Sequence, residues 1–205
     1  LSLHDALPIW IASNTIGTFL RKLGIENEDR VCLFMDKIPE LYLSFLGVLK
    51  IGAIVQPLFS AFGDESLYVR LENAGTKAII TQRKHVGKVR KIVDKLPALE
   101  NIIIVDHSEN KSLKEKEVAF NLKAEEAVEE MDIFPTKADS PSVLHYTSGT
   151  TGQPKGVRHV HYSLISQYLT TKWVLDLQDD DIYWCTADPG WVTGTSYGII
   201  GPWSM

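Results

Sequence analysis

The sequence has only two cysteines, Cys32 and Cys185, among its 205 residues. Two thiols so far apart cannot build a disulfide framework or a clustered metal site, so we predict free thiols in a reducing compartment. No apolar run approaches the roughly 20 residues that a membrane-spanning helix needs, and we expect no membrane partner. No charged leader precedes an apolar segment with a cleavage site, and together these absences predict a cytoplasmic protein.

An excess of positive charge is also absent. The 21 Lys and Arg residues stand against 26 Asp and Glu residues, which gives a formal net charge of -5. This balance provides no long-range attraction for nucleic acid, so we expect no nucleic-acid partner. Any anionic ligand must therefore be held locally, by a small number of groups.

Helical and extended patterns alternate along the first half of the chain. We predict helices at residues 10–23, 39–50, 66–73 and 86–95, and strands at residues 31–35, 53–55, 77–81 and 102–105. This alternation is typical of βαβ units. The fold class is therefore α/β, with a mixed, mostly parallel sheet flanked by helices, and the apolar run 102–105 is expected inside that sheet.

The second half begins with a charged stretch at residues 108–141. We predict a solvated excursion there, carrying one short helix at residues 123–131. Beyond it, residues 142–146 and 157–160 have the pattern of strands. Residues 162–175 have helical spacing, and this helix is expected to pack against the sheet.

The loop between those two strands has unusual chemistry. Its sequence, with the flanking residues, is Thr147-Ser148-Gly149-Thr150-Thr151-Gly152-Gln153-Pro154-Lys155-Gly156. Gly149, Gly152 and Gly156 can adopt positive φ, which lets successive backbone N–H groups point into one concavity. Such a concavity binds anions.

Side chains add to this predicted anion site. The hydroxyls of Ser148, Thr150 and Thr151 can rotate to meet phosphate oxygens. Pro154 stiffens the turn that presents Lys155 as a cationic point charge. A Walker loop is excluded, because it needs a strand-loop-helix and a Ser or Thr directly after its lysine. The pattern predicts a polyphosphate site of another kind.

Residues 146–156 resemble the phosphate-binding signature of the adenylate-forming superfamily, which comprises acyl-CoA synthetases, luciferases and adenylation domains of peptide synthetases. A second stretch, residues 183–198 followed by 201–203, is similar to the acyl-site region of acetate-CoA ligases, and we call residues 183–198 the acyl segment. Residues 31–81 also look like this branch. The resemblance covers about residues 10–205.

The acyl segment has its own local logic. Pro189 restricts the residue before it to extended geometry, and Gly190 lets the chain turn. Trp191, Val192 and Thr193 then offer a flat wall, a small apolar face and a hydroxyl. The resemblance implies that these three residues line the acyl site and that Thr193 also lies on the coenzyme A side. Acetate fits a short pocket, while propionate or another short-chain acid stays open as an alternative, because one methylene discriminates by only ~1–3 kcal/mol.

The resemblance also implies the reaction and its ligands. ATP and acetate would give acetyl-AMP and pyrophosphate, and coenzyme A would then give acetyl-CoA, with Mg²⁺ assisting. Lys155 is the expected catalytic residue, and the ATP phosphates would be held by Thr147, Ser148, Gly149, Thr150, Thr151, Gly152, Lys155 and Gly156. A protein metal site is not expected, since His145, His159 and His161 lack completing ligands at suitable spacing.

Two other functions remain open at this point. A non-catalytic nucleotide-binding module would use the loop alone, and an adenylation domain would pass its acyl group to a carrier protein. The acyl segment favours the ligase over both. One departure concerns coenzyme A: residues 82–85 read Gln-Arg-Lys-His, whereas some acetyl-CoA synthetases have an arginine-glycine-arginine pattern there.

The expected domain boundaries rest on two observations, an adapter-like start of the sequence and the family resemblance of the remainder. Residues 1–9 are what a common sequencing-adapter oligonucleotide encodes in one frame, so we predict that they are an assembly scar and exclude His4 and Asp5 from the site. Residues 10–205 are expected to form an incomplete N-terminal AMP-binding domain, without its C-terminal half and the small C-terminal domain. Such a fragment alone should be inactive.

Overall fold

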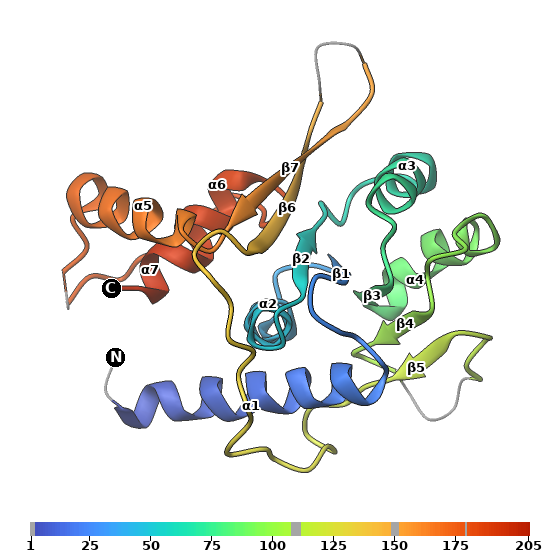
Figure 1. The fold of residues 1–205 in the computed structure, drawn as a ribbon, viewed down its shortest axis with the longest axis horizontal. Coiled ribbons are helices and arrows are strands. Elements are labelled where there is room, and N and C mark those ends of the chain that lie inside the picture. Colours follow the sequence, from blue (N-terminus) through green and yellow to red (C-terminus); the bar gives the residue numbers. More distant parts are fainter. Residues whose placement is uncertain (1–2, 108–111, 149–151, 179) are drawn as a thin grey trace.

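The computed structural model describes residues 3–107, 112–148, 152–178 and 180–205. Its core is a seven-stranded sheet in the order β5-β4-β3-β1-β2-β6-β7 (Figure 1). The strands are β1 (Arg30–Phe34), β2 (Ile54–Pro57), β3 (Ala78–Thr81), β4 (Asn101–Ile104), β5 (Glu117–Ala119), β6 (Pro141–Thr147) and β7 (Lys155–Val160). Every neighbouring pair is parallel except β6 and β7, which are antiparallel. The predicted mixed, mostly parallel sheet is confirmed.

Helices cover both faces of this sheet. On one face lie α1 (Leu3–Lys22) and α2 (Pro39–Lys50), and on the other α3 (Asp64–Ala74) and α4 (Arg83–Arg90) (Figure 1). The strands supply apolar side chains to both sides by simple alternation: Val31 and Leu33 pack toward α1 and α2, while Cys32 and Phe34 pack toward α3 and α4. Strands buried on both faces explain the continuous apolar runs of the sequence.

Local sequence signals set several element ends. Pro39 is at the first position of α2, where a missing N–H costs nothing. Gly75 ends α3 in the left-handed conformation, with φ of 58°, and its N–H bonds the carbonyl of Leu71. The predicted helix 86–95 is divided: α4 ends at Arg90, and a 3₁₀ turn, η1 (Val93–Lys95), follows.

The charged stretch 108–141 differs most from its prediction. Residues 123–131 form turns and irregular backbone, so the predicted short helix is wrong. The segment lies along α1, where the carbonyl of Glu129 accepts hydrogen bonds from Trp10 Nε1 at 3.2 Å and Asn14 Nδ2 at 3.0 Å. Tertiary hydrogen bonds from α1 replace the bonds that a helix would have made within itself.

Strand β5 in the same stretch was not predicted. Its Glu117 has a side chain that is only 1% exposed and that accepts two hydrogen bonds from Arg90, at 2.6 and 2.9 Å. The guanidinium of Arg90 holds the pKa of Glu117 below its usual range. A three-residue strand with a buried, paired glutamate looks like a solvated charge run when only the sequence is read.

The chain ends in a group of helical segments: α5 (Ser163–Thr170), the π-helical η2 (Thr171–Leu175), α6 (Val192–Thr195), the π-helical η3 (Ser196–Ile200) and α7 (Gly201–Trp203). The predicted helix 162–175 is thus present, but α5 packs on α7 and η3 more than on β7, so its predicted sheet packing holds only in part. Trp173 in η2 is 72% exposed. None of the helices described is long and apolar enough to cross a membrane.

Candidate functional site at the carboxyl edge of the sheet

Four parallel strands, β3, β1, β2 and β6, deliver their carboxyl ends to one edge of the sheet. The chain runs from β1 to β2 on one side and then returns past β1 to β3 on the other, so the winding reverses between β1 and β3. In open α/β sheets, ligands bind outside the carboxyl ends of the strands near such a reversal. Both motifs that the sequence singled out meet at this edge.

The phosphate-loop motif is a hairpin, as predicted. Thr147 at the end of β6 pairs with Lys155 at the start of β7, and Tyr146 pairs with Gly156. The hairpin extends past the other strands in Figure 1. Lys155, Thr147 and Ser148 are exposed where the two strands meet the loop.

The two described glycines of the hairpin, Gly152 and Gly156, differ in backbone conformation. Gly152 has φ of 83°, the left-handed conformation expected of an anion-binding turn, and no atom lies within 4 Å of the position that a Cβ would take. Gly156 lies inside β7 and is not among the positive-φ glycines, so that expectation is wrong for it. It packs closely within the hairpin, because a Cβ there would lie 3.2 Å from Leu144. Gly149, Thr150 and Thr151 lie outside the described residues.

Tyr146 attaches the hairpin to helix α3. Its hydroxyl donates to Asn73 Oδ1 at 2.8 Å, and its ring belongs to the core beneath α3 and α4. Burial raises the pKa of Tyr146 to about 12, so the hydroxyl keeps its proton and remains a donor. The first residue of the phosphate motif is therefore an anchor.

The acyl segment crosses the same edge and is held at several points. Lys37, in the turn after β1, donates from Nζ to the carbonyls of Thr186 at 2.6 Å and Ala187 at 3.2 Å. At Gly190 the segment passes so close to the chain after β2 that a Cβ would lie 2.3 Å from the backbone nitrogen of Phe59. Only glycine allows this approach.

The next turn of the segment is equally tight. The Asp188 carboxylate accepts the Gly190 N–H at 2.7 Å, and burial raises the pKa of Asp188. A Cβ on Gly194 would lie 2.1 Å from the Asp188 carbonyl oxygen. Thr195 donates from Oγ1 to the carbonyl of Pro189 at 2.8 Å.

His145 joins the two motifs. It lies in β6, two residues before Thr147, and its Nε2 is 2.9 Å from Thr195 Oγ1 in α6. The imidazole is 4% exposed. Burial, with the neighbouring His159 as a second cause, lowers the pKa of His145 to about 4, so the ring is neutral at physiological pH.

Between these anchors, the predicted acyl-site residues face outward. Trp191 and Val192 are each 49% exposed, and Thr193 is also exposed. The Trp191 ring lies 6.2 Å from the ring of Phe59, measured between centroids. A rigid backbone thus presents three accessible side chains beside the strand that leads into the phosphate hairpin.

Sequence reasoning missed Lys37, Thr195 and the role of Asp36. The Asp36 carboxylate, after β1, is held by Lys84 and by His85 Nε2 at 2.7 Å, and its N–H donates to Gln82 Oε1 at 2.9 Å. The Lys84 ammonium is the main reason that the pKa of Asp36 falls to about 2. The stretch 82–85, which departs from the arginine-glycine-arginine pattern, therefore contacts the end of β1. Nothing in its spacing signals a partner 46 residues or more away.

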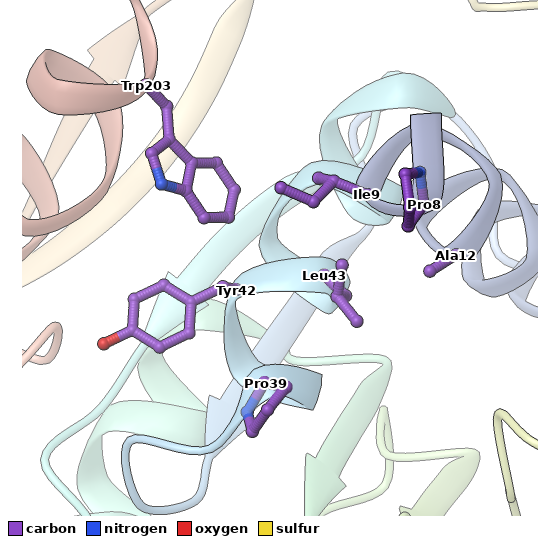
Figure 2. Close-up of a pocket in the computed structure, with 7 residues that line it drawn as sticks. All are labelled: Pro8, Ile9, Ala12, Pro39, Tyr42, Leu43 and Trp203. Atoms are coloured by element: carbon purple, nitrogen blue, oxygen red, sulfur yellow. The ribbon is translucent and has the colours of Figure 1, made fainter. Parts of the chain in front are cut away.

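A separate apolar hollow lies between α1, α2 and α7. It is lined by Pro8, Ile9, Ala12, Pro39, Tyr42, Leu43 and Trp203 (Figure 2). None of these side chains carries a charge that would meet a phosphate or carboxylate, and Pro8 and Ile9 belong to the predicted scar. We therefore place the site at the carboxyl edge and not in this hollow. Among the residues that the structure describes, no group of three His, Cys, Asp or Glu side chains could hold a metal ion.

Known proteins are similar to this chain in both sequence and fold. The chain is 46% identical over 192 residues to the acetyl-coenzyme A synthetase of Bacillus subtilis (strain 168), covering 93% of this chain and 33% of that protein. It is 35% identical over 211 residues to the acetyl-coenzyme A synthetase of Pyrobaculum arsenaticum, covering 94% of this chain and 31% of that one. The chain thus spans about a third of the length of these curated relatives.

Two solved structures extend the comparison. A Brucella canis acyl-CoA synthetase superimposes with a TM-score of 0.84 at 30% identity, over 95% of this chain and 34% of that one. The anthranilate CoA ligase AuaEII, solved with anthranoyl-AMP, gives 0.85 at 25% identity, over 95% and 37%. The AMP-binding enzyme family matches residues 9–205, and the chain belongs to that family.

Proposed function

We propose that this chain is part of an ATP-dependent acyl-CoA ligase that activates acetate as acetyl-AMP and then forms acetyl-CoA. The observation that carries the proposal is the acyl segment, whose anchored backbone presents Trp191, Val192 and Thr193 beside the strand of the phosphate hairpin. The names of the relatives support acetate. Residues 1–9 as a scar and 10–205 as part of an N-terminal domain remain predictions, as does a cytoplasmic location.

The hairpin suits the phosphates of ATP. Lys155 places a cation where β7 leaves the loop, Thr147 and Ser148 add exposed hydroxyls, and the backbone at Gly152 is open to close approach. We propose that Gly149, Thr150, Thr151 and Gly156 complete this cradle. Mg²⁺ would arrive on the nucleotide phosphates, which is its usual mode of binding.

The first step joins two anions. A carboxylate oxygen of the acid forms a bond to the α-phosphorus while the bond from that phosphorus to the pyrophosphate oxygen breaks. Negative charge grows on the leaving pyrophosphate, and Lys155 with the hairpin donors would stabilise it. Trp191 and Val192 would hold the acyl chain so that the carboxylate faces the hairpin.

In the second step, the sulfur of coenzyme A bonds to the acyl carbon, the bond from that carbon to the AMP oxygen breaks, and the thiol proton is released. Thr193 is exposed on the acyl segment and would lie on the thiol side. This step distinguishes the ligase from a nucleotide-binding module and from a domain that loads a carrier protein.

The decisive experiment uses the complete reading frame that contains this chain. Acid-dependent exchange between ATP and pyrophosphate should be strongest with acetate and weaker with propionate and butyrate, and acetyl-CoA should form when coenzyme A is added. Strongest exchange with propionate would move the proposal to that acid, and no exchange with any acid would reject ligase activity.

Lys155→Ala tests the site itself. Removing the cation should lower exchange by about a hundredfold or more, as expected for a group that stabilises developing charge. Lys123→Ala, a change on the exposed surface of the segment along α1, is the control and should retain full exchange. Near-normal exchange in a folded Lys155→Ala protein would rule out the proposed role.

A further inference from the structure

The hydrogen bonds around Thr195 favour one protonated nitrogen of His145. The carbonyl oxygen of Pro189 can only accept, and we assign the single hydroxyl hydrogen of Thr195 to it, at 2.8 Å. The same hydroxyl oxygen is 2.9 Å from His145 Nε2 and has no second hydrogen to give. In this arrangement His145 donates from Nε2, and its proton is on Nε2 and not on Nδ1.

The other ring nitrogen supports a specific role for this contact. Nδ1 of His145 is buried and has no hydrogen-bond partner among the described residues. A buried polar atom without a partner costs free energy, typically about 1–3 kcal/mol. An apolar side chain would avoid that penalty. The contact made by Nε2 is therefore what the imidazole contributes at this position.

The bonded residues bracket the acyl-site residues. Pro189 precedes Trp191 by two positions, and Thr195 follows Thr193 by two. A single ring in β6 is thus connected to both ends of the stretch that faces the substrate. The same strand continues from His145 into Thr147, at the mouth of the phosphate hairpin.

We propose that His145 is a positioning residue that holds the acyl segment at a set distance from the phosphate hairpin, through the chain His145 to Thr195 to Pro189. It touches no substrate and acts only through the segment. This inference rests on the proposed function, because it assigns the alignment of acid and ATP to one buried hydrogen bond.

The surroundings favour a permanent link over a switch. The His159 ring from β7 stands edge-to-face against His145, with centroids 5.3 Å apart. Burial and His159 together keep the imidazole neutral. The donor at Nε2 therefore persists over the pH range in which the ligase would work.

Matched substitutions in the complete protein test the role. His145→Leu removes the donor, whereas His145→Gln can place an amide N–H near the position of Nε2. We expect His145→Leu to raise the KM for the acid at least tenfold while the KM for ATP changes less than twofold. His145→Gln should stay within about threefold of the unsubstituted protein. Equal defects in the two variants, or a defect in the KM for ATP alone, would overturn the proposal.

Two further readouts do not depend on activity. Ring ¹⁵N shifts of labelled histidine, assigned by the signal lost in His145→Gln, should show the proton on Nε2 at pH 7; a proton on Nδ1 would contradict the geometry. In unfolding experiments, the double variant His145→Leu/Thr195→Val should lose less stability than the sum of the two single changes, because both remove the same contact. Strictly additive losses would count against the link. No exchange in the unsubstituted protein, by contrast, would reject the proposed function alone.

Discussion

Lys37 Nζ lies 2.6 Å from the carbonyl oxygen of Thr186, a residue 149 positions later in the chain. The bond ties the turn after β1 to the start of the acyl segment. Because the ammonium also reaches the carbonyl of Ala187, one side chain satisfies two backbone acceptors. The turn after β1 thus helps to position the acyl segment, together with the contacts that the segment makes within itself.

Lys37→Met should loosen this attachment. Methionine keeps the length and much of the apolar stem but donates no hydrogen bond. We expect a loss of about 1 kcal/mol in the free energy of unfolding, below the range of about 1.5–3 kcal/mol for charged donors, because Lys37 is exposed. The KM for the acid should also rise, because the acyl segment is held less firmly. Chemical denaturation measures the first effect, and an unchanged KM for the acid would mean that the segment is held well enough without Lys37.

Gly194→Ala tests the tight turn in the acyl segment. The new methyl group would lie 2.1 Å from the Asp188 carbonyl oxygen, so the backbone must move. We expect a loss of about 2 kcal/mol or more, in the range of overpacked cores. Gly87→Ala is the matched control, because its methyl group would meet no atom within 4 Å in helix α4. That change should stabilise the protein by roughly 0.5–1 kcal/mol.

Tyr146→Phe tests the anchor of the hairpin on α3. It removes the bond to Asn73 and leaves that amide oxygen without its donor, which should cost about 1–2 kcal/mol. Tyr162→Phe, at a residue that is 63% exposed, should change stability by less than about 0.5 kcal/mol. Thermal unfolding of the two variants makes the comparison, and equal melting temperatures would argue against the anchor.

His145 predicts a pH dependence of stability. Its pKa falls from an ordinary 6.5 to about 4 on folding, so between these values the unfolded chain binds the extra proton. Stability should therefore be complete above about pH 6.5 and decrease as the pH falls toward 4, by on the order of 3 kcal/mol. In His145→Gln this component should vanish and the profile below pH 6.5 should be flatter. Identical profiles would show that other groups control the acid limb.

Val192→Ala tests the choice of acid. A smaller side chain at this exposed position enlarges the proposed pocket by about the volume of two methyl groups. The ratio of kcat/KM for propionate over that for acetate should rise about tenfold, which corresponds to ~1.4 kcal/mol. Val174→Ala, in η2 outside the acyl segment, should leave the ratio unchanged. A ratio that does not move would exclude Val192 from the acyl wall.

The sequence by itself determined the α/β class, the alternating elements and the hairpin around the phosphate motif. These follow from local chemistry: apolar periodicity in the strands, Pro39 at a helix start and glycines in a turn. It also singled out Trp191, Val192 and Thr193, through resemblance. Short-range patterns suffice for such features because each is set within a few residues.

Only the tertiary structure decided which distant groups meet. Glu117 finds Arg90 and becomes a buried strand residue, and Glu129 accepts bonds from α1 in place of a helix. His145 becomes the link between two motifs only because β6 lies against α6. Hydrogen bonds between residues far apart leave no periodic trace in a chain, since their partners are chosen by the packing of the sheet and helices around them.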